Sequence, residues 1–518
     1  MTPRIYIPGD SGALALGAEK VAKAIQAELA ARGQTAMIIR NGSRGAYFLE
    51  PMVEVATSTG RIAYGPVMPS DVKSLFDSGF LSGGHHKRWL GNPDKIPFLQ
   101  KQTRLTFARC GIIDPLSLDA YKRHSGLAGL AKAVAMAPAD IVAQVTESGL
   151  RGRGGAGFPT GIKWKTVLDT TAERKYSVCN ADEGDSGTFS DRMIMEGDPF
   201  VLIEGMAIAG IATRATKGFI YIRSEYPHAV ATMRKAVEIA RHAGVLGVNV
   251  LGSAHAFDME VRVGAGAYVC GEETSLLDSL EGKRGEVRAK PPLPAHKGLF
   301  GRPTVINNVI SLASVPIVMD RGAQYYKDFG MGRSRGTIPI QIAGNVKYPG
   351  LFEAAFGMTL GEIVDEIGGG TASGRPVKAV QVGGPLGAYF PRELFDTPFD
   401  YEAFAAKDGL IGHAGIVVFD DSADMLKQAR FAMEFCAIES CGKCTPCRVG
   451  SVRGTETLDK LARGIEPDKQ IALVTDLCNT MKFGSLCALG GFTPYPVMSA
   501  LTHFPEDFKP APVAQAAE

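Results

Sequence analysis

The sequence predicts a multidomain α/β protein whose last domain is a helical bundle carrying a metal cluster. Its 518 residues exceed what one hydrophobic core organises, so about three or four domains are expected. Apolar runs alternate between strand and helix periodicity over most of the chain, which is typical of α/β domains. Beyond Met425 the pattern becomes helical and contains the run Cys441-Gly-Lys-Cys444-Thr-Pro-Cys447. The cluster is therefore expected near the carboxyl terminus.

Residues 1–80 predict a thioredoxin-like domain. The expected elements, in chain order, are a strand at 4–7, a helix at 18–31, strands at 35–40, 52–56 and 61–64, and a helix from about Ser70. This order of elements is typical of the thioredoxin fold. No cysteine precedes Cys110, so the domain is predicted to hold neither a C-x-x-C redox pair nor a cluster.

The rest of the chain divides where its pattern changes. Residues 81–120 have weak periodicity and predict an irregular connector, in which His85 and His86 are interpreted as loop residues rather than metal ligands. The later units, in chain order, are an α/β domain at 121–332, a β-grasp-like module at 333–420, a helical cluster domain at 421–508 and a Pro/Ala-rich tail at 509–518 that is expected to fray. The module is predicted from strands at 337–343 and 379–382 around a helix near 360–367.

Four cysteines predict a [4Fe-4S] cluster. Cys441, Cys444 and Cys447 have the spacing C-x2-C-x2-C, which brings three thiolates together on one loop, and Cys487 supplies a distant fourth. Zinc is the alternative metal, but zinc sites more often use two separated C-x2-C knuckles. Structural cysteines without a metal are the other alternative.

Composition narrows the class of protein further. The nine cysteines are an odd number and no cleavable apolar segment precedes Arg4, so a cytoplasmic protein without disulfides is expected. The net charge is +2 and the charges are interspersed, which argues against nucleic acid or an anionic membrane as a partner. The longest apolar run, 201–212, is interrupted by Glu204 and is too short to span a bilayer. The remaining cysteines, Cys110, Cys179, Cys270, Cys436 and Cys478, are expected to be buried small residues.

A glycine-rich segment, 151–157, matches the pattern G-x-G-x-x-G. A helical run at 139–147 precedes it where a dinucleotide-binding motif needs a strand, so the usual interpretation of that pattern fails. Glycines still allow backbone N–H groups to approach a phosphate, and Lys163 lies just downstream to add positive charge. A plain tight turn is an equally good interpretation of this segment alone.

Two acidic segments suggest contacts to sugar hydroxyls. The first, Ser177–Gly187, is a strand that runs into a loop with Asn180, Asp182, Glu183 and Asp185. The second, Tyr268–Thr274, is interpreted as another strand that ends at a helix start with Gly271, Glu272 and Glu273. Capping of that helix by Glu272 and Glu273 is the alternative.

Taken together, these motifs resemble the NADH-binding, FMN-carrying subunit of complex I. The resemblance covers about residues 105 to 500, and its motifs are Gly149–Gly161, Cys179–Glu183, Gly264–Thr274, Lys290-Pro-Pro, Ile306-Asn-Asn308 and Glu439–Cys447. It implies a diaphorase that exchanges electrons between NAD(H), FMN and a [4Fe-4S] cluster. Because the flavin performs hydride transfer, no side chain is expected to act as a catalytic acid or base.

The resemblance also implies a set of binding residues. It places FMN on Gly152, Gly154, Lys163, Asn180, Asp182, Gly271, Asn307 and Asn308. It places the NAD(H) channel on Phe158, Glu183, Asp185, Glu272, Glu273 and Lys290. Thr166 and Leu293 stand where many relatives carry phenylalanines near the adenine, so adenine stacking is expected to rest on Phe158 alone.

The N-terminal extension discriminates among members of this family. A fused thioredoxin-like domain without cluster ligands is most like the beta subunit of the soluble, molybdenum-dependent NAD+ formate dehydrogenase. The implied partners are a molybdenum/iron–sulfur catalytic subunit and a small [2Fe-2S] subunit of thioredoxin-like fold, with no direct membrane contact. The alternatives are a complex I subunit and the diaphorase subunit of an NAD-reducing hydrogenase, and after them a non-enzymatic zinc scaffold.

Overall fold

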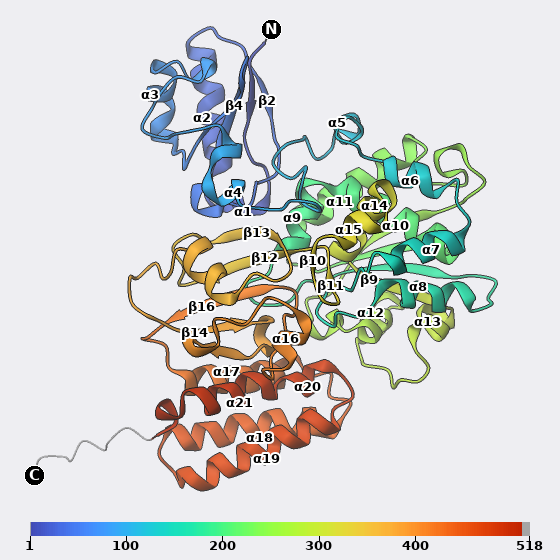
Figure 1. The fold of residues 1–518 in the computed structure, drawn as a ribbon, viewed down its shortest axis with the longest axis vertical. Helices are drawn as coiled ribbons and strands as arrows, with labels where there is room; N and C mark the ends of the chain where they lie inside the picture. The colour runs from blue at the N-terminus through green and yellow to red at the C-terminus, as the bar shows by residue number, and fades with distance from the viewer. Residues whose placement is uncertain (1, 510–518) are drawn as a thin grey trace, which may run out of the picture.

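A computed structural model describes residues 2–509, so most of the predicted tail lies outside the described residues. The domains are stacked along the long axis of the molecule (Figure 1). The N-terminal domain, in blue, lies at one end, and the helices of the cluster domain, in red, lie at the other. The α/β domain and the β-grasp-like module lie side by side between them. The exact domain boundaries stay a prediction.

The N-terminal sheet has the strand order β2-β1-β3-β4-β5. Its strands are β1 (Arg4–Tyr6), β2 (Met37–Ile39), β3 (Val53–Thr57), β4 (Gly60–Tyr64) and β5 (Trp89–Gly91), and its helices are α1 (Ser11–Ala15), α2 (Ala18–Ala31) and α3 (Val72–Asp77). β1 and β2 are parallel and the other pairs are antiparallel. The apolar face of α2 packs on this sheet through Val21, Ile25 and Leu29. The predicted thioredoxin-like order is therefore present.

The prediction of an irregular connector over 81–120 is wrong in part. β5 pairs with β4 and completes the N-terminal sheet, and α4 (Pro97–Gln100) and α5 (Leu118–Arg123) follow it. Weak periodicity hid β5 because only three residues form the strand, and its Trp89 is partly exposed. His85 stacks on Trp89, with 4.3 Å between the ring centroids, and His86 bonds Ser74, as expected of loop residues.

The α/β domain is built on a four-stranded sheet of order β8-β7-β6-β9, in which all pairs are parallel. The strands are β6 (Tyr176–Ala181), β7 (Lys217–Ile222), β8 (Asp258–Val263) and β9 (Thr304–Asn308). The helices are α6 (Ala128–Ala133), α7 (Pro138–Glu147), α8 (Thr160–Asp169), α9 (Ser190–Gly197), α10 (Pro199–Thr213), α11 (Pro227–His242), α12 (Glu273–Leu280), α13 (Pro294–Lys297), α14 (Val309–Arg321) and α15 (Ala323–Lys327). Parallel strands joined by helices explain the alternating pattern of the sequence.

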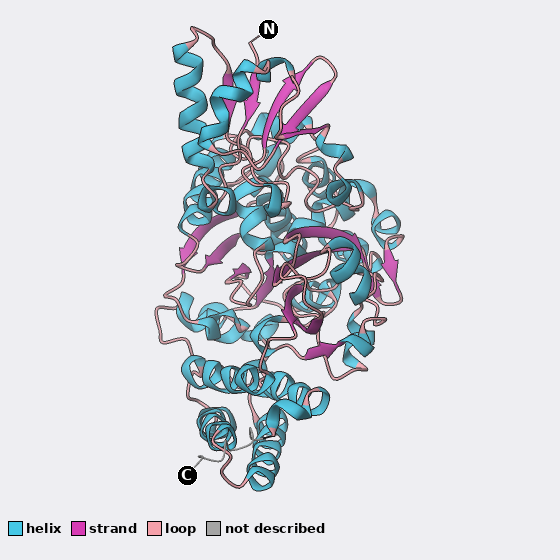
Figure 2. Ribbon diagram, turned by 90° about the vertical axis from the view of Figure 1, so that its left-hand side faces the viewer, coloured by secondary structure: helices cyan, strands magenta, loops and turns pink. Residues whose placement is uncertain are grey.

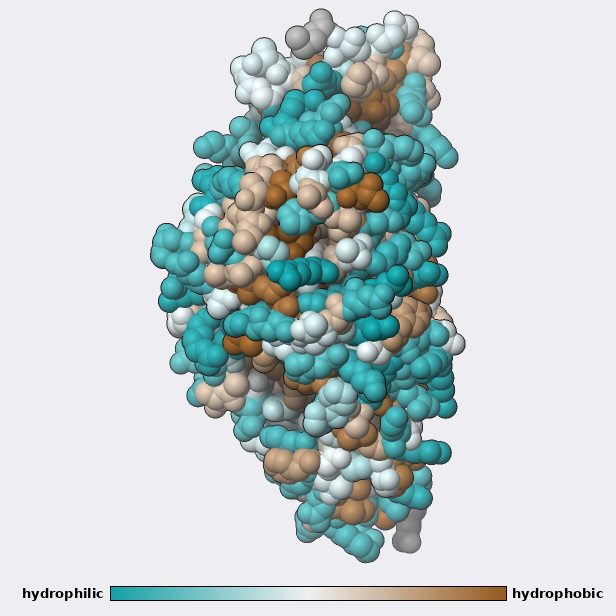
Figure 3. Space-filling view, turned by 90° about the vertical axis from the view of Figure 1, so that its right-hand side faces the viewer, coloured by the Kyte–Doolittle hydropathy of each residue, from teal (hydrophilic) through white to brown (hydrophobic). Residues whose placement is uncertain are grey.

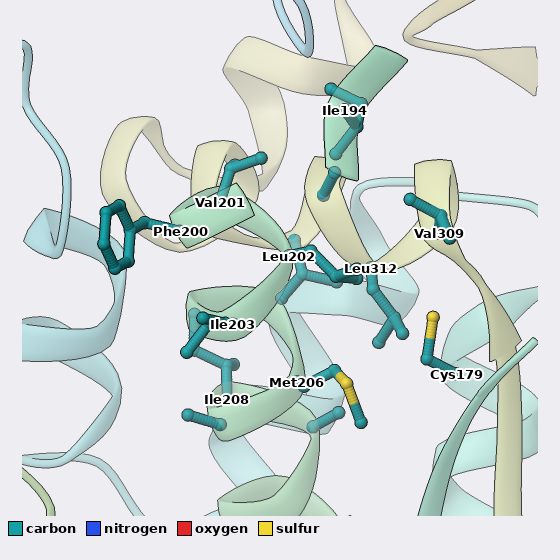
Figure 4. Close-up of a cluster of buried hydrophobic side chains, with 14 of the residues drawn as sticks. Cys179, Ile194, Phe200, Val201, Leu202, Ile203, Met206, Ile208, Val309 and Leu312 are labelled. Carbon is teal, nitrogen blue, oxygen red and sulfur yellow. The ribbon is translucent and has the colours of Figure 1, made fainter. Parts of the chain in front are cut away.

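Helix α10 forms the centre of the core of this domain. All of its residues are buried, including Glu204, whose carboxylate accepts N–H bonds from Leu127 and Leu130 and a bond from the Tyr121 hydroxyl. Figure 4 shows Phe200 on one side of this helix and Met206 on another, toward Cys179 of β6. The long apolar run of the sequence is therefore a helix that is buried on all sides by the rest of its domain.

The β-grasp-like module is a five-stranded mixed sheet of order β13-β12-β16-β14-β15. Its strands are β12 (Thr337–Gly344), β13 (Gly350–Ala355), β14 (Val377–Val382), β15 (Tyr389–Pro391) and β16 (Gly415–Asp420), preceded by the small hairpin β10 (Gly330–Met331) and β11 (Ser334–Arg335). The neighbouring strands β12 and β16 are parallel. The predicted helix near 360–367 is a single π-helical segment, Glu362–Ile367, and α16 (Tyr401–Ala405) precedes β16.

The C-terminal domain is a bundle of helices at the end of the molecule opposite the N-terminus (Figure 2). They are α17 (Met425–Glu439), α18 (Thr445–Ala462), α19 (Pro467–Gly484), α20 (Ala488–Phe492) and α21 (Pro494–His503). Their buried faces share one hydrophobic cluster with β6, β7 and α12 of the α/β domain. The bundle is thus continuous with the face of the parallel sheet opposite α10.

Among the described residues, none of the helices combines the length and the apolar character that crossing a membrane requires. The face drawn in Figure 3 has small brown patches between hydrophilic residues. Three large apolar side chains are the most exposed among the described residues. They are Val248 of the α/β domain, Ile438 of α17 and Phe483 of α19, so they belong to more than one domain.

Candidate functional site

A cavity of about 300 Å³ opens at the carboxyl ends of β6 and β9. β7 and β8 lie on one side of β6 and β9 lies on the other, so the strand order reverses at this point. Open parallel sheets bind ligands in such a crevice. Register places Asn180 of β6 directly beside Asn308 of β9. The β-grasp-like module contributes Gly383, Gly412 and His413 to the wall, and α20 of the cluster domain contributes Leu489.

The glycine-rich segment 151–157 forms a narrow loop over this cavity. The Gly152 N–H donates to the Phe158 carbonyl at 2.8 Å, which closes the loop on itself. A Cβ on Gly154 would lie 2.9 Å from the Asn308 Cβ, closer than real Cβ atoms approach one another. Gly155 has a φ of 117°, which only glycine adopts readily. The loop therefore needs Gly154 and Gly155 for close approach and for conformation.

Arg153, the residue between the first two glycines of the motif, anchors the loop. Its side chain is 2% exposed, and its guanidinium donates to the Thr337 and Arg335 carbonyls and to the Tyr326 hydroxyl. Its own N–H donates to the Ser311 hydroxyl at 2.8 Å. Sequence reasoning missed this residue because the motif treats its position as variable. The anchor ties the loop to both the α/β domain and the β-grasp-like module.

The segment after β6 forms the floor of the cavity. The Asn180 amide donates to the Gly271 carbonyl at 2.8 Å, and its oxygen accepts the Asp182 N–H. The Asp182 carboxylate has no hydrogen-bond partner among the described residues, although it lines the cavity. Burial raises the pKa of Asp182 to about 7, an effect that Arg223 only partly opposes. A buried carboxylate that faces a cavity is available to bond ligand hydroxyls.

Glu183 and Asp185 are bonded mainly to protein groups. Glu183 has a φ of 39°, and its buried carboxylate accepts the N–H groups of Asp191 and Arg192 in the first turn of α9. Asp185 accepts a bond from the Tyr268 hydroxyl at 2.8 Å. Both residues line the cavity, but Glu183 acts first as a cap of α9. The structure therefore brings both carboxylates to the predicted site. Glu183 is bonded there to N–H groups of α9, and Asp185 to the Tyr268 hydroxyl.

The interpretation of Tyr268–Gly271 as a strand is wrong, because these residues form a 3-10 turn before α12. Glu272 is the N-cap residue of α12, and one carboxylate oxygen accepts the N–H groups of Thr274 and Ser275. Its other oxygen lies 2.9 Å from Lys290 Nζ. The capping interpretation thus holds for one oxygen of Glu272 and leaves the other in an ion pair.

Glu273, which follows the cavity residue Glu272, lies between two lysines. Its carboxylate is 2.9 Å from Lys290 Nζ and 3.7 Å from Lys163 Nζ. Burial favours the neutral acid, but the two lysines outweigh it and hold the pKa of Glu273 below its usual range. Lys163 also donates to the Ile306 carbonyl at 3.0 Å. The site therefore presents an ionised carboxylate with two cations beside it.

The remaining predicted residues separate into buried and exposed groups. Asn307 is buried and accepts a bond from the Trp164 indole at 2.8 Å, whereas Asn308 caps α14. Phe158 and Leu293 are each about half-exposed, and Thr166 bonds the Ile162 carbonyl within α8. Phe158 is thus accessible for stacking on a planar ligand, and Leu293 offers only an aliphatic surface.

The predicted cluster ligands come from two helix starts. Cys444 is the N-cap residue of α18 and Cys487 that of α20, while Cys447 lies in the first turn of α18. A Cβ on Gly490 would lie 2.7 Å from the Cys447 Cβ, which brings α20 against α18. Cys441 lies in the preceding loop, where its carbonyl accepts a bond from Arg284. Helix N-termini favour negative charge, so this donor set fits a thiolate-bound cluster.

A fifth cysteine lies beside this donor set. Cys436 Sγ is 3.7 Å from Cys447 Sγ, and the hydrogen bond between them lowers the pKa of Cys447 to about 7. All of the five cysteines outside the motif are buried, as predicted. Among the described residues, Cys436 is the only member of this group that hydrogen-bonds a predicted ligand.

The cluster site and the cavity share a boundary. Leu489, two residues after Cys487, lines the cavity, and the Tyr268 N–H donates to Glu439 Oε2 at 2.9 Å. The Tyr268 ring also packs edge-on against Phe435 of α17, with 4.9 Å between centroids. The fold and these two adjacent sites define a protein that holds a nucleotide-like cofactor next to a metal cluster.

Family models match three parts of the chain. Residues 145–317 match the Nuo51 FMN-binding domain, residues 339–387 the SLBB domain, and residues 427–511 the NADH-ubiquinone oxidoreductase-F iron-sulfur binding region. The matched regions contain the glycine-rich loop, the loops after β6 and before α12, and all of the four motif cysteines.

Relatives in sequence and structure agree with these models. The NADP-reducing hydrogenase subunit HndC of Solidesulfovibrio fructosivorans is 45% identical over 410 residues, which are 79% of this chain and 84% of that protein. An NADH-quinone oxidoreductase subunit of Rhizobium meliloti is 44% identical over 392 residues, which are 76% of this chain and 93% of that protein. A crystal structure of an NAD+-reducing [NiFe]-hydrogenase in the air-oxidized state matches with a TM-score of 0.69 and 27% identity, covering 99% of this chain and 86% of that chain.

The chain therefore belongs to the family of NADH-binding subunits that carry FMN and a [4Fe-4S] cluster. Its cofactors are FMN, the [4Fe-4S] cluster and NAD(H). It is an NAD(H)-dependent flavin/iron–sulfur oxidoreductase subunit. The predicted family, fold class and cofactors are confirmed.

Proposed function

We propose that the chain passes electrons between NAD(H) and the clusters of a partner subunit. The observation that carries this proposal is the shared boundary between the cofactor cavity and the Cys487 loop. FMN, when bound, exchanges hydride with nicotinamide and single electrons with an iron–sulfur cluster. The protein contributes the two adjacent sites and keeps both partly buried. We assign no side chain as a catalytic acid or base.

We propose that the predicted binding residues divide into two groups. The FMN group comprises Gly152, Gly154, Lys163, Asn180, Asp182, Gly271, Asn307 and Asn308, and the NAD(H) group comprises Phe158, Glu183, Asp185, Glu272, Glu273 and Lys290. The Asp182 carboxylate, which lines the cavity, supports a contact with cofactor hydroxyls. Half-exposed Phe158 supports stacking with a nucleobase. Cys441, Cys444, Cys447 and Cys487 are the proposed cluster ligands.

We further propose that the electron donor is a formate-oxidising molybdenum subunit, with a small [2Fe-2S] subunit as a second partner. The fused N-terminal domain, which has no cysteine before Cys110, supports this choice within the family. The second candidate is a hydrogenase diaphorase subunit. It is favoured by the hydrogenase structure, because that match covers 99% of this chain and so includes the N-terminal domain.

Metal and flavin analysis tests both the proposed electron transfer and the proposed formate-oxidising partner. The isolated chain is expected to contain one FMN and four irons, and the complex purified from its source cells is expected to contain molybdenum and to reduce NAD+ with formate. Nickel with hydrogen-driven activity would favour the hydrogenase candidate, and quinone-linked activity in membranes would favour complex I. Two additional irons in a [2Fe-2S] species on the isolated chain would refute the prediction of an N-terminal domain without a cluster. A colourless, zinc-containing protein would refute the proposed function.

Replacing Glu273 by alanine is expected to shift the preference for NADH over NADPH. We propose that Glu273 lies near the adenosine ribose, where its ionised carboxylate would repel a 2′-phosphate. Juxtaposed like charges cost on the order of several kcal/mol in a partly desolvated site. The two lysines beside Glu273 would then be free to attract the phosphate.

The measurement is kcat/KM for NADH and NADPH in the wild type and in Glu273→Ala. Asp169→Ala is a matched control, because Asp169 is an exposed carboxylate on α8 that pairs with Lys165. The ratio is expected to change only in Glu273→Ala. A ratio that stays within about twofold, less than roughly 0.5 kcal/mol, would show that Glu273 does not select the nucleotide.

A further inference from the structure

His413 is a buried histidine in the cavity wall that the sequence motifs do not contain. It lies in the loop before β16, next to Gly412, which forms a backbone bridge with Gly155 of the glycine-rich loop. The Gln341 amide donates to the His413 carbonyl at 2.7 Å, and the Gln341 oxygen accepts the Ser190 N–H at 2.8 Å. The loop that carries His413 is therefore held against both the glycine-rich loop and α9.

The imidazole lies between two buried carboxylates. His413 Nε2 is 3.0 Å from Asp191 Oδ1, 3.4 Å from Glu183 Oε1 and 3.1 Å from Ser190 Oγ. His413 is 6% exposed, Glu183 8% and Asp191 0%. These carboxylates come from the α/β domain, whereas the imidazole comes from the β-grasp-like module. The ion pair therefore joins two domains at the cavity wall.

This ion pair extends to the predicted FMN-binding residues. Asp191 Oδ2 accepts a bond from the Asn308 amide at 2.7 Å, and the Asn308 Cβ is the atom that Gly154 approaches. The Asn308 oxygen is used to cap α14. The Asn308 side chain is thus held by Asp191 and by the first turn of α14, and Asp191 links it to His413.

The carboxylates around His413 favour its protonated form. Asp185 lies on the cavity side, and Arg223 donates to the Glu183 carbonyl at 2.7 Å. Arg192 of α9 lies over the Tyr226 ring, 5.4 Å from its centroid. Burial disfavours the imidazolium, but Asp191 and Glu183 outweigh it and raise the pKa of His413 well above its usual range. The wall therefore contains a fixed positive charge beside acidic groups.

We propose that His413 is a positioning residue whose imidazolium, held through Nε2 by the two carboxylates in the wall of the FMN cavity, favours the reduced cofactor over the oxidised one. Reduction adds negative charge to the cofactor. A nearby cation stabilises this charge more strongly in a desolvated cavity than it would in water. This inference rests on the proposed placement of FMN in the cavity. Asp191 has the opposite charge and is expected to have the opposite effect.

The test is the midpoint potential of the bound flavin, measured by spectroelectrochemical titration of the purified full-length chain. His413→Gln removes the charge and keeps a hydrogen-bonding side chain, and it is expected to disfavour reduction about tenfold, which is about 30 mV for a two-electron couple. Asp191→Asn is expected to shift the potential in the opposite direction. His413→Lys is expected to restore most of the wild-type value. His503→Gln, in a separate groove beside α21, is the control and is expected to leave the potential unchanged.

A charge effect shifts the midpoint potential in opposite directions in His413→Gln and Asp191→Asn. Loosened packing would shift it in the same direction in both variants. Shifts of the same sign, or shifts below twofold, about 9 mV, in both variants would overturn the inference. If His413→Gln loses its flavin, Asp191→Asn still decides by the sign of its shift, and His413→Lys decides by whether its potential stays near the wild-type value. A wild-type chain that binds no flavin would instead refute the proposed function and this inference with it.

Discussion

Replacing Cys444 by serine is expected to abolish the [4Fe-4S] cluster while NADH still bleaches the bound flavin. Serine is a poor ligand for iron in such clusters, which are held by cysteine thiolates. The cavity and the cysteine loop share a boundary, but the side chains of the cavity floor belong to β6 and β9. Donor-driven reduction of NAD+ is expected to fall to background, and NADH-driven flavin bleaching is expected to stay within about twofold of the wild type.

Cys478→Ser is the matched control for this experiment. Cys478 lies on α19, is 1% exposed, and its burial raises the pKa of its thiol to about 12. Iron content and donor-driven activity are expected to stay at wild-type levels in this variant. Full donor-driven turnover in cluster-free Cys444→Ser would mean that electrons reach FMN by a route that bypasses this cluster.

Replacing Arg153 by methionine is expected to destabilise the chain and release the flavin. The change leaves the Thr337 and Arg335 carbonyls and the Tyr326 hydroxyl without their donor. Each buried polar group left unpaired costs about 1–3 kcal/mol, so a loss of about 3 kcal/mol or more is expected. The midpoint of thermal unfolding, followed by flavin fluorescence, is expected to fall by roughly 3 °C or more for a chain of this length.

Arg333→Met provides the comparison. Arg333 is a largely exposed arginine whose ion pair with Glu402 spans 3.8 Å. Surface substitutions of this kind usually change stability by less than about 0.5 kcal/mol. Equal unfolding midpoints and equal flavin retention in the two variants would show that Arg153 does not anchor the glycine-rich loop.

Elements with strong periodicity were predictable from the sequence. The helix predicted at 18–31 and the strand predicted from Ser177 are present in the structure as α2 and β6, because burial leaves a clear pattern of apolar residues in both. β5 and the turn at Tyr268–Gly271 were not predictable in this way. A strand of three residues and a 3-10 turn are too short for periodicity to distinguish.

The candidate site was predictable only where it follows a contiguous motif. The cysteine spacing and the loops after β6 and before α12 identify their own positions. Arg153, Asp191 and His413 were missed for a different reason. Asp191 and His413 are 222 positions apart in the chain, and only the docking of the β-grasp-like module on α9 brings them within 3.0 Å. No local pattern in a single sequence records such a pairing.

Three domains contribute residues to the wall of the cavity, so ligand binding is linked to the docking of these domains. A ligand that contacts all of the walls binds only the chain in which these domains are docked, so its binding free energy adds directly to the free energy of docking. If FMN occupies this cavity, as we propose, its insertion and the closure of the interdomain contacts are thermodynamically linked. A chain that lacks the flavin then also lacks the contribution of flavin binding to the docking of the elements that carry Gly412 and Leu489.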